Sequence, residues 1–273
     1  MLTQRSARVR DARKLTRRQG RAKAGLFLVE GPQAVREALA ATAEERPGLV
    51  AELFASPPAA ARYADIIDAA LVAGVPVHHA DEPALAALSE TVTPQGLVAV
   101  CRPVTVSLDA ALGHTPQLVA ILAEARDPGN AGTVIRCADA AGADAVVLSH
   151  GSVDPHGGKC VRAAAGSLFH LPICADAELE AVIAATRRRG LTVLAAEGAG
   201  RVDLDDAEAT GLLVRPTAWL FGNEAHGLPA GTTALADEVV RVPIYGRAES
   251  LNLAAAAAVC LYASARVHRR QVR

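Results

Sequence analysis

The carboxy-terminal half of the chain contains a series of short, almost uninterrupted apolar segments, and this feature constrains its fold most. The segments are LVAIL (118–122), DAVVLS (144–149), LTVLAAE (191–197), TAWLFG (217–222) and EVVRVPI (238–244), with helix-like stretches between them. Strands that are apolar along both faces are typical of a parallel sheet covered on both sides. The pattern therefore predicts an α/β domain over residues 118–273.

A smaller alternation of strands and helices precedes this domain. FLVE (27–30) reads as a strand, Gly31-Pro32 as a turn, and residues 34–41 have helical spacing. The same alternation continues with expected strands at 49–56, 75–80 and 96–103 and expected helices at 63–74 and 82–90. We therefore expect a small α/β domain over 24–102. Residues 103–117 contain two prolines and a glycine and are predicted to be a linker.

Composition limits the class of protein. Hydrophobic residues make up 51% of the chain and aromatic residues only 3%, so aliphatic side chains must build the core. The longest apolar run is too short to cross a bilayer and no secretory signal is read, so we expect a cytoplasmic protein without a membrane anchor. Five cysteines without CxxC spacing indicate reduced thiols. His156 and His226 lack a second ligand at suitable spacing, so no metal site is expected.

Residues 1–23, the basic segment, contain nine lysines and arginines and a single acidic residue. Such a segment can be a solvated tail. Clustered cations also bind nucleic acid, because they release counterions from phosphates. The residues predicted to contact RNA here are Arg13, Lys14, Arg17 and Arg18. Lys159 and Arg162, in SVDPHGGKCVRAAAGS (152–167), are predicted as further RNA contacts.

Three segments join a strand to a loop or helix start and carry unusual polar residues. They are motif 1, DPGNAGTVIRCADAAG (127–142), motif 2, FGNEAHGL (221–228), and motif 3, VPIYGRAESLNLAAAAAV (242–259). On residue type alone, Asn130 is most simply the cap of a helix over 131–141, and Ser250 the cap of the helix over 251–262. Arg136 is by the same reasoning a solvated helix residue, and Glu224 an exposed turn acid.

Together the three motifs resemble the signatures of the SpoU (TrmH-like) RNA 2′-O-methyltransferases, in the same order and structural context. The resemblance implies a carboxy-terminal α/β-knot domain, a deep trefoil knot, which binds S-adenosylmethionine and dimerises through its final helices. FLVEGPQAVREAL and TPQGLVAV also resemble the substrate RNA-binding domain that precedes it in the family. The segment VLAAEGAGRVDL partly matches a Rossmann cofactor loop, but the full G-x-G-x-x-G is absent.

The resemblance also assigns roles to individual residues. It places Asn130, Arg136, Glu224, Ser250 and Asn252 in the catalytic site, where Arg136 would bind a phosphate and assist removal of the ribose hydroxyl proton. The residues that it implies for cofactor binding are Ala196, Glu197, Gly198, Phe221, Gly222, Asn223, Val242, Ile244, Ser250 and Leu251.

These features predict methyl transfer to a ribose 2′-hydroxyl of RNA. Ribosomal RNA is preferred over tRNA because the chain has the additional amino-terminal domain. Two alternatives remain open: a tRNA 2′-O-methyltransferase, and a catalytically silent RNA-binding or ribosome-assembly protein on the same scaffold. The sequence names neither the RNA nor the nucleotide, and it carries no distinct mark of antibiotic resistance.

Overall fold

The computed structural model of the chain describes residues 1–223, 227–228 and 231–271, and it divides into two compact units. The first contains residues 1–104 and 154–170, and the second contains residues 105–153 and 171–273. The expected ranges 24–102 and 118–273 therefore differ from the observed units. Residues 154–170 lie between two strands of the second unit in sequence, yet they belong to the first.

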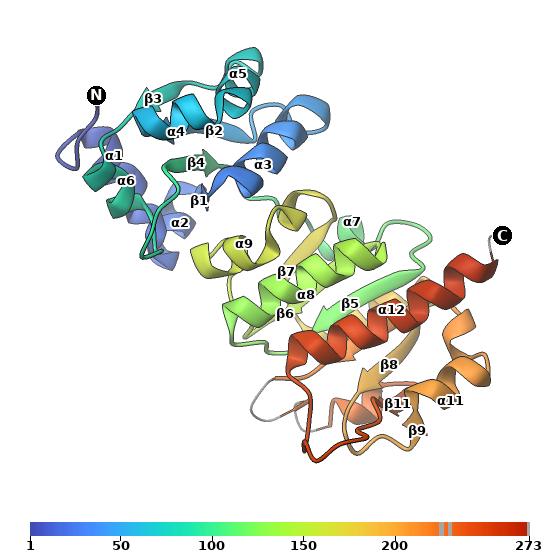
Figure 1. Cartoon of the computed structure of the whole chain (residues 1–273). Coiled ribbons are helices and arrows are strands. Elements are labelled where there is room, and N and C mark those ends of the chain that lie inside the picture. The colour runs from blue at the N-terminus through green and yellow to red at the C-terminus, as the bar shows by residue number, and fades with distance from the viewer. Residues whose placement is uncertain (224–226, 229–230, 272–273) are drawn as a thin grey trace. The chain divides into compact units, whose positions relative to one another are not determined.

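The second unit is built on a seven-stranded sheet in the order β7-β6-β5-β10-β8-β11-β9, and every pair in it is parallel (Figure 1). Its strands are β5 (Leu118–Leu122), β6 (Ala145–Ser149), β7 (Ile173–Ala177), β8 (Thr192–Ala196), β9 (Val202–Asp203), β10 (Thr217–Phe221) and β11 (Glu238–Arg241). The parallel sheet expected from the apolar segments is thus confirmed. β10 lies between β5 and β8 in register, so Phe221 is opposite both Leu122 and Ala196. The carboxyl ends of these three strands are therefore level.

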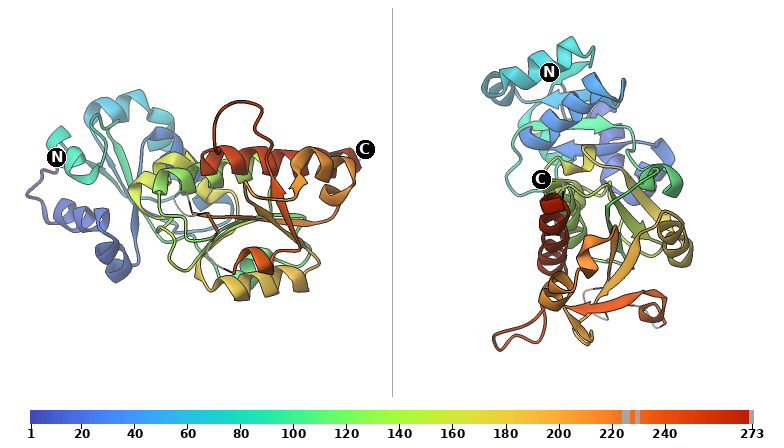
Figure 2. Two further views of the ribbon diagram at one scale, coloured as in Figure 1. Left: turned by 90° about the horizontal axis from the view of Figure 1, so that it is seen from below. Right: turned by 90° about the vertical axis from the view of Figure 1, so that its right-hand side faces the viewer.

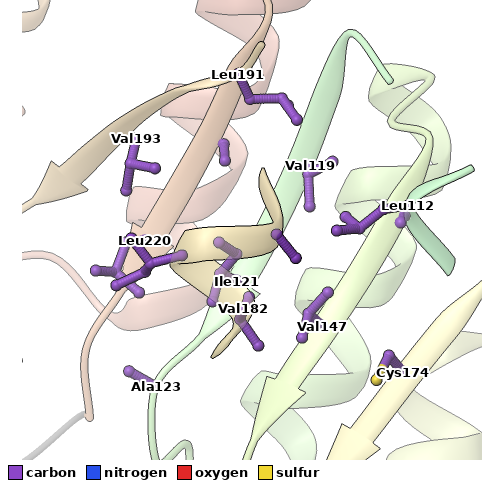
Figure 3. Packing of buried hydrophobic residues seen from close by; sticks show 14 of the residues in the cluster. Leu112, Val119, Ile121, Ala123, Val147, Cys174, Val182, Leu191, Val193 and Leu220 are labelled. Atoms are coloured by element: carbon purple, nitrogen blue, oxygen red, sulfur yellow. The ribbon is translucent and has the colours of Figure 1, made fainter. Parts of the chain in front are cut away.

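Helices cover both faces of this sheet (Figure 2). α8 (Pro128–Ala141) and α12 (Leu253–Gln271) pack against each other and against β5, whereas α7 (Leu108–Leu112) and α10 (Leu179–Arg188) pack on the other face. The unit also contains α11 (Leu204–Ala209) and the 3₁₀ helices η3 (Leu212–Val214) and η4 (Thr233–Leu235). Aliphatic side chains such as Ile121, Val193 and Leu220 fill the core on the α10 face (Figure 3). On the α12 face, the indole of the buried Trp219 donates a 2.9 Å hydrogen bond to Ser264 of that helix.

The first unit has a four-stranded mixed sheet in the order β1-β4-β2-β3. Its strands are β1 (Phe27–Glu30), β2 (Val50–Ala55), β3 (Val77–His79) and β4 (Leu97–Cys101), and β4 runs antiparallel to both of its neighbours. Its helices are α1 (Ala7–Arg13), η1 (Lys14–Thr16), α2 (Arg18–Ala24), α3 (Pro32–Glu44), α4 (Pro57–Arg62), α5 (Ala64–Val72), α6 (Glu82–Leu88), α9 (Gly158–Ala164) and η2 (Ser167–Phe169).

Three parts of the chain are more structured than the sequence indicated. The basic segment forms α1, η1 and most of α2, and its Val9, Ala12 and Leu15 are buried. The predicted linker 103–117 contains α7, which begins after Ser107 because that hydroxyl accepts the backbone N–H of Ala110. α12 begins at Leu253, two residues later than expected, and continues to Gln271. Within the described ranges, no helix has both the length and the apolar character to span a bilayer.

Candidate active site

The loops after β8, β10 and β11 and the start of α12 surround a cavity of about 760 Å³, hereafter the sheet-edge cavity. Its volume lies in the range that binds a cofactor-sized molecule. Every residue predicted to bind the cofactor lines it: Ala196, Glu197, Gly198, Phe221, Gly222, Asn223, Val242, Ile244, Ser250 and Leu251. The lining also includes Asn252, which was predicted as catalytic, and eight residues that were not named individually: Asp203, Gly227, Arg241, Pro243, Tyr245, Glu249, Leu253 and Ala256.

Register explains why distant segments meet at this cavity. Phe221 pairs with Ala196, and Ala196 pairs with Val240 of the next strand, so the three loops leave the sheet at one level. The loop after β10 then folds back on itself. Asn223 and Gly227 exchange backbone hydrogen bonds of 2.7 and 2.9 Å. A side-chain Cβ at Gly222 would lie only 2.3 Å from the carbonyl carbon of Gly227, so this close approach requires glycine.

Asn223 links this loop to the strand ends on its other side. Its amide donates a 2.8 Å hydrogen bond to the carbonyl oxygen of Glu124, which follows β5. The N–H of Glu124 in turn donates to the Ser149 hydroxyl at 3.0 Å. Glu124 has a φ of 51°, a left-handed conformation that is unfavourable for a residue with a side chain. Such strain persists where surrounding contacts hold it. Glu124 was missed because nothing local in the sequence marks this backbone conformation.

Motif 1 and motif 3 meet through two asparagine side chains. The Nδ2 of Asn252 donates to the Oδ1 of Asn130 at 3.0 Å. The expected capping role of Asn130 is wrong: Asp127 caps α8, because it has extended backbone angles and its carboxylate accepts the N–H of Asn130 at 2.8 Å. The expected capping role of Ser250 is also wrong, since the Oδ1 of Asn252 accepts the N–H of Ala254 at 2.9 Å and α12 begins after it.

The other predicted catalytic residues are placed differently. Ser250 is exposed and lines the sheet-edge cavity. Arg136 is exposed on α8, lies outside the cavity lining, and forms no hydrogen bond or ion pair within the described part of the chain. Glu224 lies outside the described residues. The structure therefore joins Asn130 to Asn252, which lines the cavity, and it places Arg136 on the exposed surface of α8.

Three polar contacts connect the segments around the cavity. The guanidinium of Arg241 hydrogen-bonds both oxygens of Asp203, with Nη2 3.0 Å from Oδ2, and holds the pKa of that carboxyl below its ordinary value. The Tyr245 hydroxyl donates to Asp205 at 2.8 Å, and this carboxylate raises the tyrosine pKa. The Glu197 carboxylate accepts a 3.2 Å hydrogen bond from Thr233. The first two contacts tie the end of β11 and the loop after it to β9 and the start of α11, and the third ties the loop after β8 to η4.

The residues predicted to bind RNA all lie in the first unit. Arg13, Lys14 and Arg18 are exposed on the helices of the basic segment, Arg17 is exposed between η1 and α2, and Lys159 is exposed on α9. Lys14 pairs with Asp11 at 2.7 Å. Arg162 is only 26% exposed and pairs with Glu30 at 3.3 Å and Glu90 at 3.5 Å, so its charge is already balanced.

His156 is not a simple loop residue. It is buried, its Nε2 accepts the N–H of Val104 at 3.1 Å, and its ring lies 4.6 Å from that of Phe27. His226 lies outside the described residues. Across the part of the chain that the structure describes, no three metal-binding side chains gather at one point.

Comparisons with known proteins match both parts of the chain. The SpoU rRNA methylase family matches residues 117–262, and an MRM3-like substrate-binding domain matches residues 6–99. RlmP of Bacillus subtilis (strain 168), a 23S rRNA (guanosine(2553)-2′-O)-methyltransferase, is 36% identical over 258 residues, which cover 93% of this chain and 94% of the relative.

Two solved structures have the same fold over almost the whole chain. The AdoMet-bound rRNA methyltransferase from Sinorhizobium meliloti has a TM-score of 0.82 at 31% identity and covers 96% of this chain and 95% of its own. The SpoU methyltransferase AviRb from Streptomyces viridochromogenes, in complex with AdoMet, has a TM-score of 0.82 at 28% identity and covers 98% and 99%. The chain therefore belongs to the SpoU rRNA methylase family of S-adenosylmethionine-dependent RNA 2′-O-methyltransferases.

Proposed function

We propose that this protein methylates a ribose 2′-hydroxyl in the RNA of the large ribosomal subunit, in the cytoplasm. The observation that carries the proposal is the similarity to RlmP across 93% of this chain, which includes the substrate-binding unit as well as the sheet-edge cavity. Substrate choice resides in that unit, so similarity over it favours ribosomal RNA over tRNA.

The lining of the sheet-edge cavity fits S-adenosylmethionine. Phe221, Ile244 and Leu251 offer apolar surface to an adenine ring, and the carboxylates of Glu197 and Glu249 complement a cationic ligand. Backbone groups of the loops at 196–198, 221–223 and 242–251 supply hydrogen bonds. When bound, the cofactor supplies an activated methyl group, and the protein's task is to position the hydroxyl that receives it.

The residues at the cavity mouth perform that task. The Asn252 amide, fixed by Asn130 and by the first turn of α12, orients the ribose together with the Ser250 hydroxyl. Arg136 binds the adjoining phosphate and favours loss of the 2′-hydroxyl proton, because a guanidinium stabilises the developing negative charge. The carboxylate of Glu224 supports these residues and the neighbouring loops.

We further propose a homodimer formed through α12. Val259 and Tyr262 are 43% and 47% exposed on the same face of this helix, and Ala255 lies exposed one turn before them. Exposed apolar residues aligned on one face favour burial against a second copy. We also propose that this unit contains a trefoil knot. Between β11 and α12, the segment 242–252 lines the same cavity as the loops after β8 and β10.

The experiment uses ribosomal RNA and tRNA from a strain in which the gene is deleted. Purified protein and S-adenosylmethionine with a deuterated methyl group are added, and labelled nucleotides are mapped by mass spectrometry. We expect label at a 2′-O-methyl position of large-subunit rRNA. Label confined to tRNA would contradict the substrate. Absence of label together with absence of cofactor binding in calorimetry would favour the silent RNA-binding protein.

Arg136→Ala tests the catalytic assignment in the same assay. Loss of a group that assists proton transfer lowers the rate by roughly 100-fold or more, whereas cofactor affinity should stay unchanged because Arg136 lies outside the cavity lining. Arg188→Ala is the matched control, since Arg188 is an exposed helical arginine in the same unit that forms no ion pair within the described residues. Equal rates for the two variants would refute the role of Arg136.

A further inference from the structure

The basic segment carries its charges on a folded surface. Val9, Ala12 and Leu15 are buried in one core cluster with Leu85 and Leu88 of α6. Six of its cations form no ion pair with any residue that the structure describes: Arg5, Arg10, Arg13, Arg17, Arg18 and Lys23. Groups that bind nucleic acid phosphates are unpaired cations held on one surface. The segment therefore holds exposed, unpaired cations on a folded scaffold before any ligand is present.

Arg21 determines the shape of this surface. Its side chain is only 10% exposed, and its Nη1 donates hydrogen bonds of 3.1 Å to the carbonyl oxygens of both Leu15 and Thr16. The remaining nitrogens face one carboxylate, that of Asp154, with Nε 2.9 Å and Nη2 2.7 Å from Oδ2. A single guanidinium thus joins α2 to the end of η1, across the turn at Arg17.

The two helical pieces also touch without intervening side chains. Gly20 of α2 lies so close to η1 that a Cβ there would be 1.9 Å from the carbonyl oxygen of Lys14. Only glycine permits this contact, and it sets the distance between the cations on η1 and those on α2. The turn at Arg17 and Arg18 is therefore closely packed between η1 and α2.

Asp154 is itself held in place. Its Oδ1 accepts the backbone N–H of His156 at 2.9 Å, and the His156 ring lies beside it at 3.5 Å. Burial favours the protonated form of this carboxyl, but hydrogen bonds from His156 and Arg21 outweigh burial and keep its pKa well below the ordinary value. The carboxylate therefore stays ionised at neutral pH, opposite a buried guanidinium.

We propose that Asp154, acting through Arg21, is a positioning residue for RNA binding, because it presets the turn that presents Arg17 and Arg18 to the phosphate backbone of the substrate. The inference rests on the proposed function, since the ligand is the RNA that the enzyme methylates. A surface that is already in its bound shape loses less conformational entropy on binding. Weakening the Asp154–Arg21 pair should therefore weaken RNA binding although neither side chain touches the RNA.

The test measures RNA binding by fluorescence anisotropy over a range of salt, and methyl transfer in parallel, for the full-length protein. We expect Asp154→Asn to raise the KM for RNA roughly tenfold and to lower the slope of log affinity against log salt by about 2, as phosphate contacts are lost. The kcat and the affinity for S-adenosylmethionine should stay unchanged. Arg21→Lys should behave like Asp154→Asn, because lysine cannot bridge two carbonyls and a carboxylate.

Two control variants separate positioning from general stability. Asp65→Asn breaks an exposed 2.8 Å ion pair with Arg36 in the same unit and should leave RNA binding unchanged. Leu39→Ala destabilises the core of that unit without touching the turn, and it should lower the melting temperature with an unchanged salt slope. An unchanged slope for Asp154→Asn, or an equal loss of slope for Leu39→Ala, would overturn the inference. A wild-type protein that binds RNA without methylating it would refute the proposed function alone.

Discussion

Gly222 offers the sharpest test of the sheet-edge cavity, because a single methyl group added there meets only backbone. In Gly222→Ala the new Cβ would lie 2.3 Å from the carbonyl carbon of Gly227 and 2.4 Å from the nitrogen of Leu228. Carbon atoms in contact are separated by about 3.5–4.0 Å, so the overlap exceeds 1 Å. No rotamer change relieves it, and the paired backbone hydrogen bonds of Asn223 and Gly227 must shift.

The size of the effect follows from the cost of overpacking, which is about 1–3 kcal/mol. Gly222, Asn223 and Gly227 all line the cavity, so displacement of this loop acts directly on the ligand site. If the free energy of cofactor binding becomes less favourable by that amount, the affinity for S-adenosylmethionine falls about fivefold to about 150-fold. Isothermal titration calorimetry measures this range directly, and circular dichroism verifies that the variant is folded.

Gly198→Ala is the matched control. Gly198 lines the same cavity, yet a Cβ there meets nothing within 4 Å. We expect it to lose less affinity for the cofactor than Gly222→Ala, since no loop has to move. The reasoning is refuted if Gly222→Ala binds as tightly as wild type, or if the two alanine variants lose equal affinity.

Three further predictions concern other parts of the chain. Asn252→Ser keeps a capping oxygen at the start of α12 but removes the donor to Asn130, so single-turnover methyl transfer should fall strongly while thermal stability changes by only about 1 kcal/mol. The pKa of Asp154 lies below the ordinary 3.8, so its ionised form stabilises the protein above pH 3.8 and this stabilisation is lost as pH falls below it; Asp154→Asn should flatten acid unfolding curves. Val259→Arg combined with Tyr262→Arg should shift the mass measured by light scattering from dimer to monomer, and a wild-type monomer would contradict the proposed interface.

Local patterns were sufficient for much of the fold and for the family. The apolar segments at 118–122 and 217–222 became β5 and β10 with nearly the expected bounds, because strand periodicity and burial are visible over five residues. The three motifs predicted the family and its cofactor, and both are confirmed by the comparisons. The residues that the resemblance implied for cofactor binding line one cavity, at the ends of β8 and β10 and in the segment between β11 and α12.

Elements without such a pattern were missed. β7 ends in Asp176 and Ala177, is only partly buried there, and has a left-handed residue at Asp176, so it lacks the uniform apolar run of its neighbours. The choice between Asp127 and Asn130 as helix cap was also not local. Both side chains can cap, and only the backbone angles of Asp127 show which one does.

The sequence by itself determined which segments become strands and which loops carry polar groups, because these properties depend on neighbours a few residues away. Only the tertiary structure decided which of those groups meet. Asn130 and Asn252 are 122 positions apart and Arg21 and Asp154 are 133 apart. The first pair depends on α12 packing against α8, and the second on the return of residues 154–170 to the amino-terminal unit. Contacts of this range depend on how the whole chain packs, and no local pattern in the sequence records that packing.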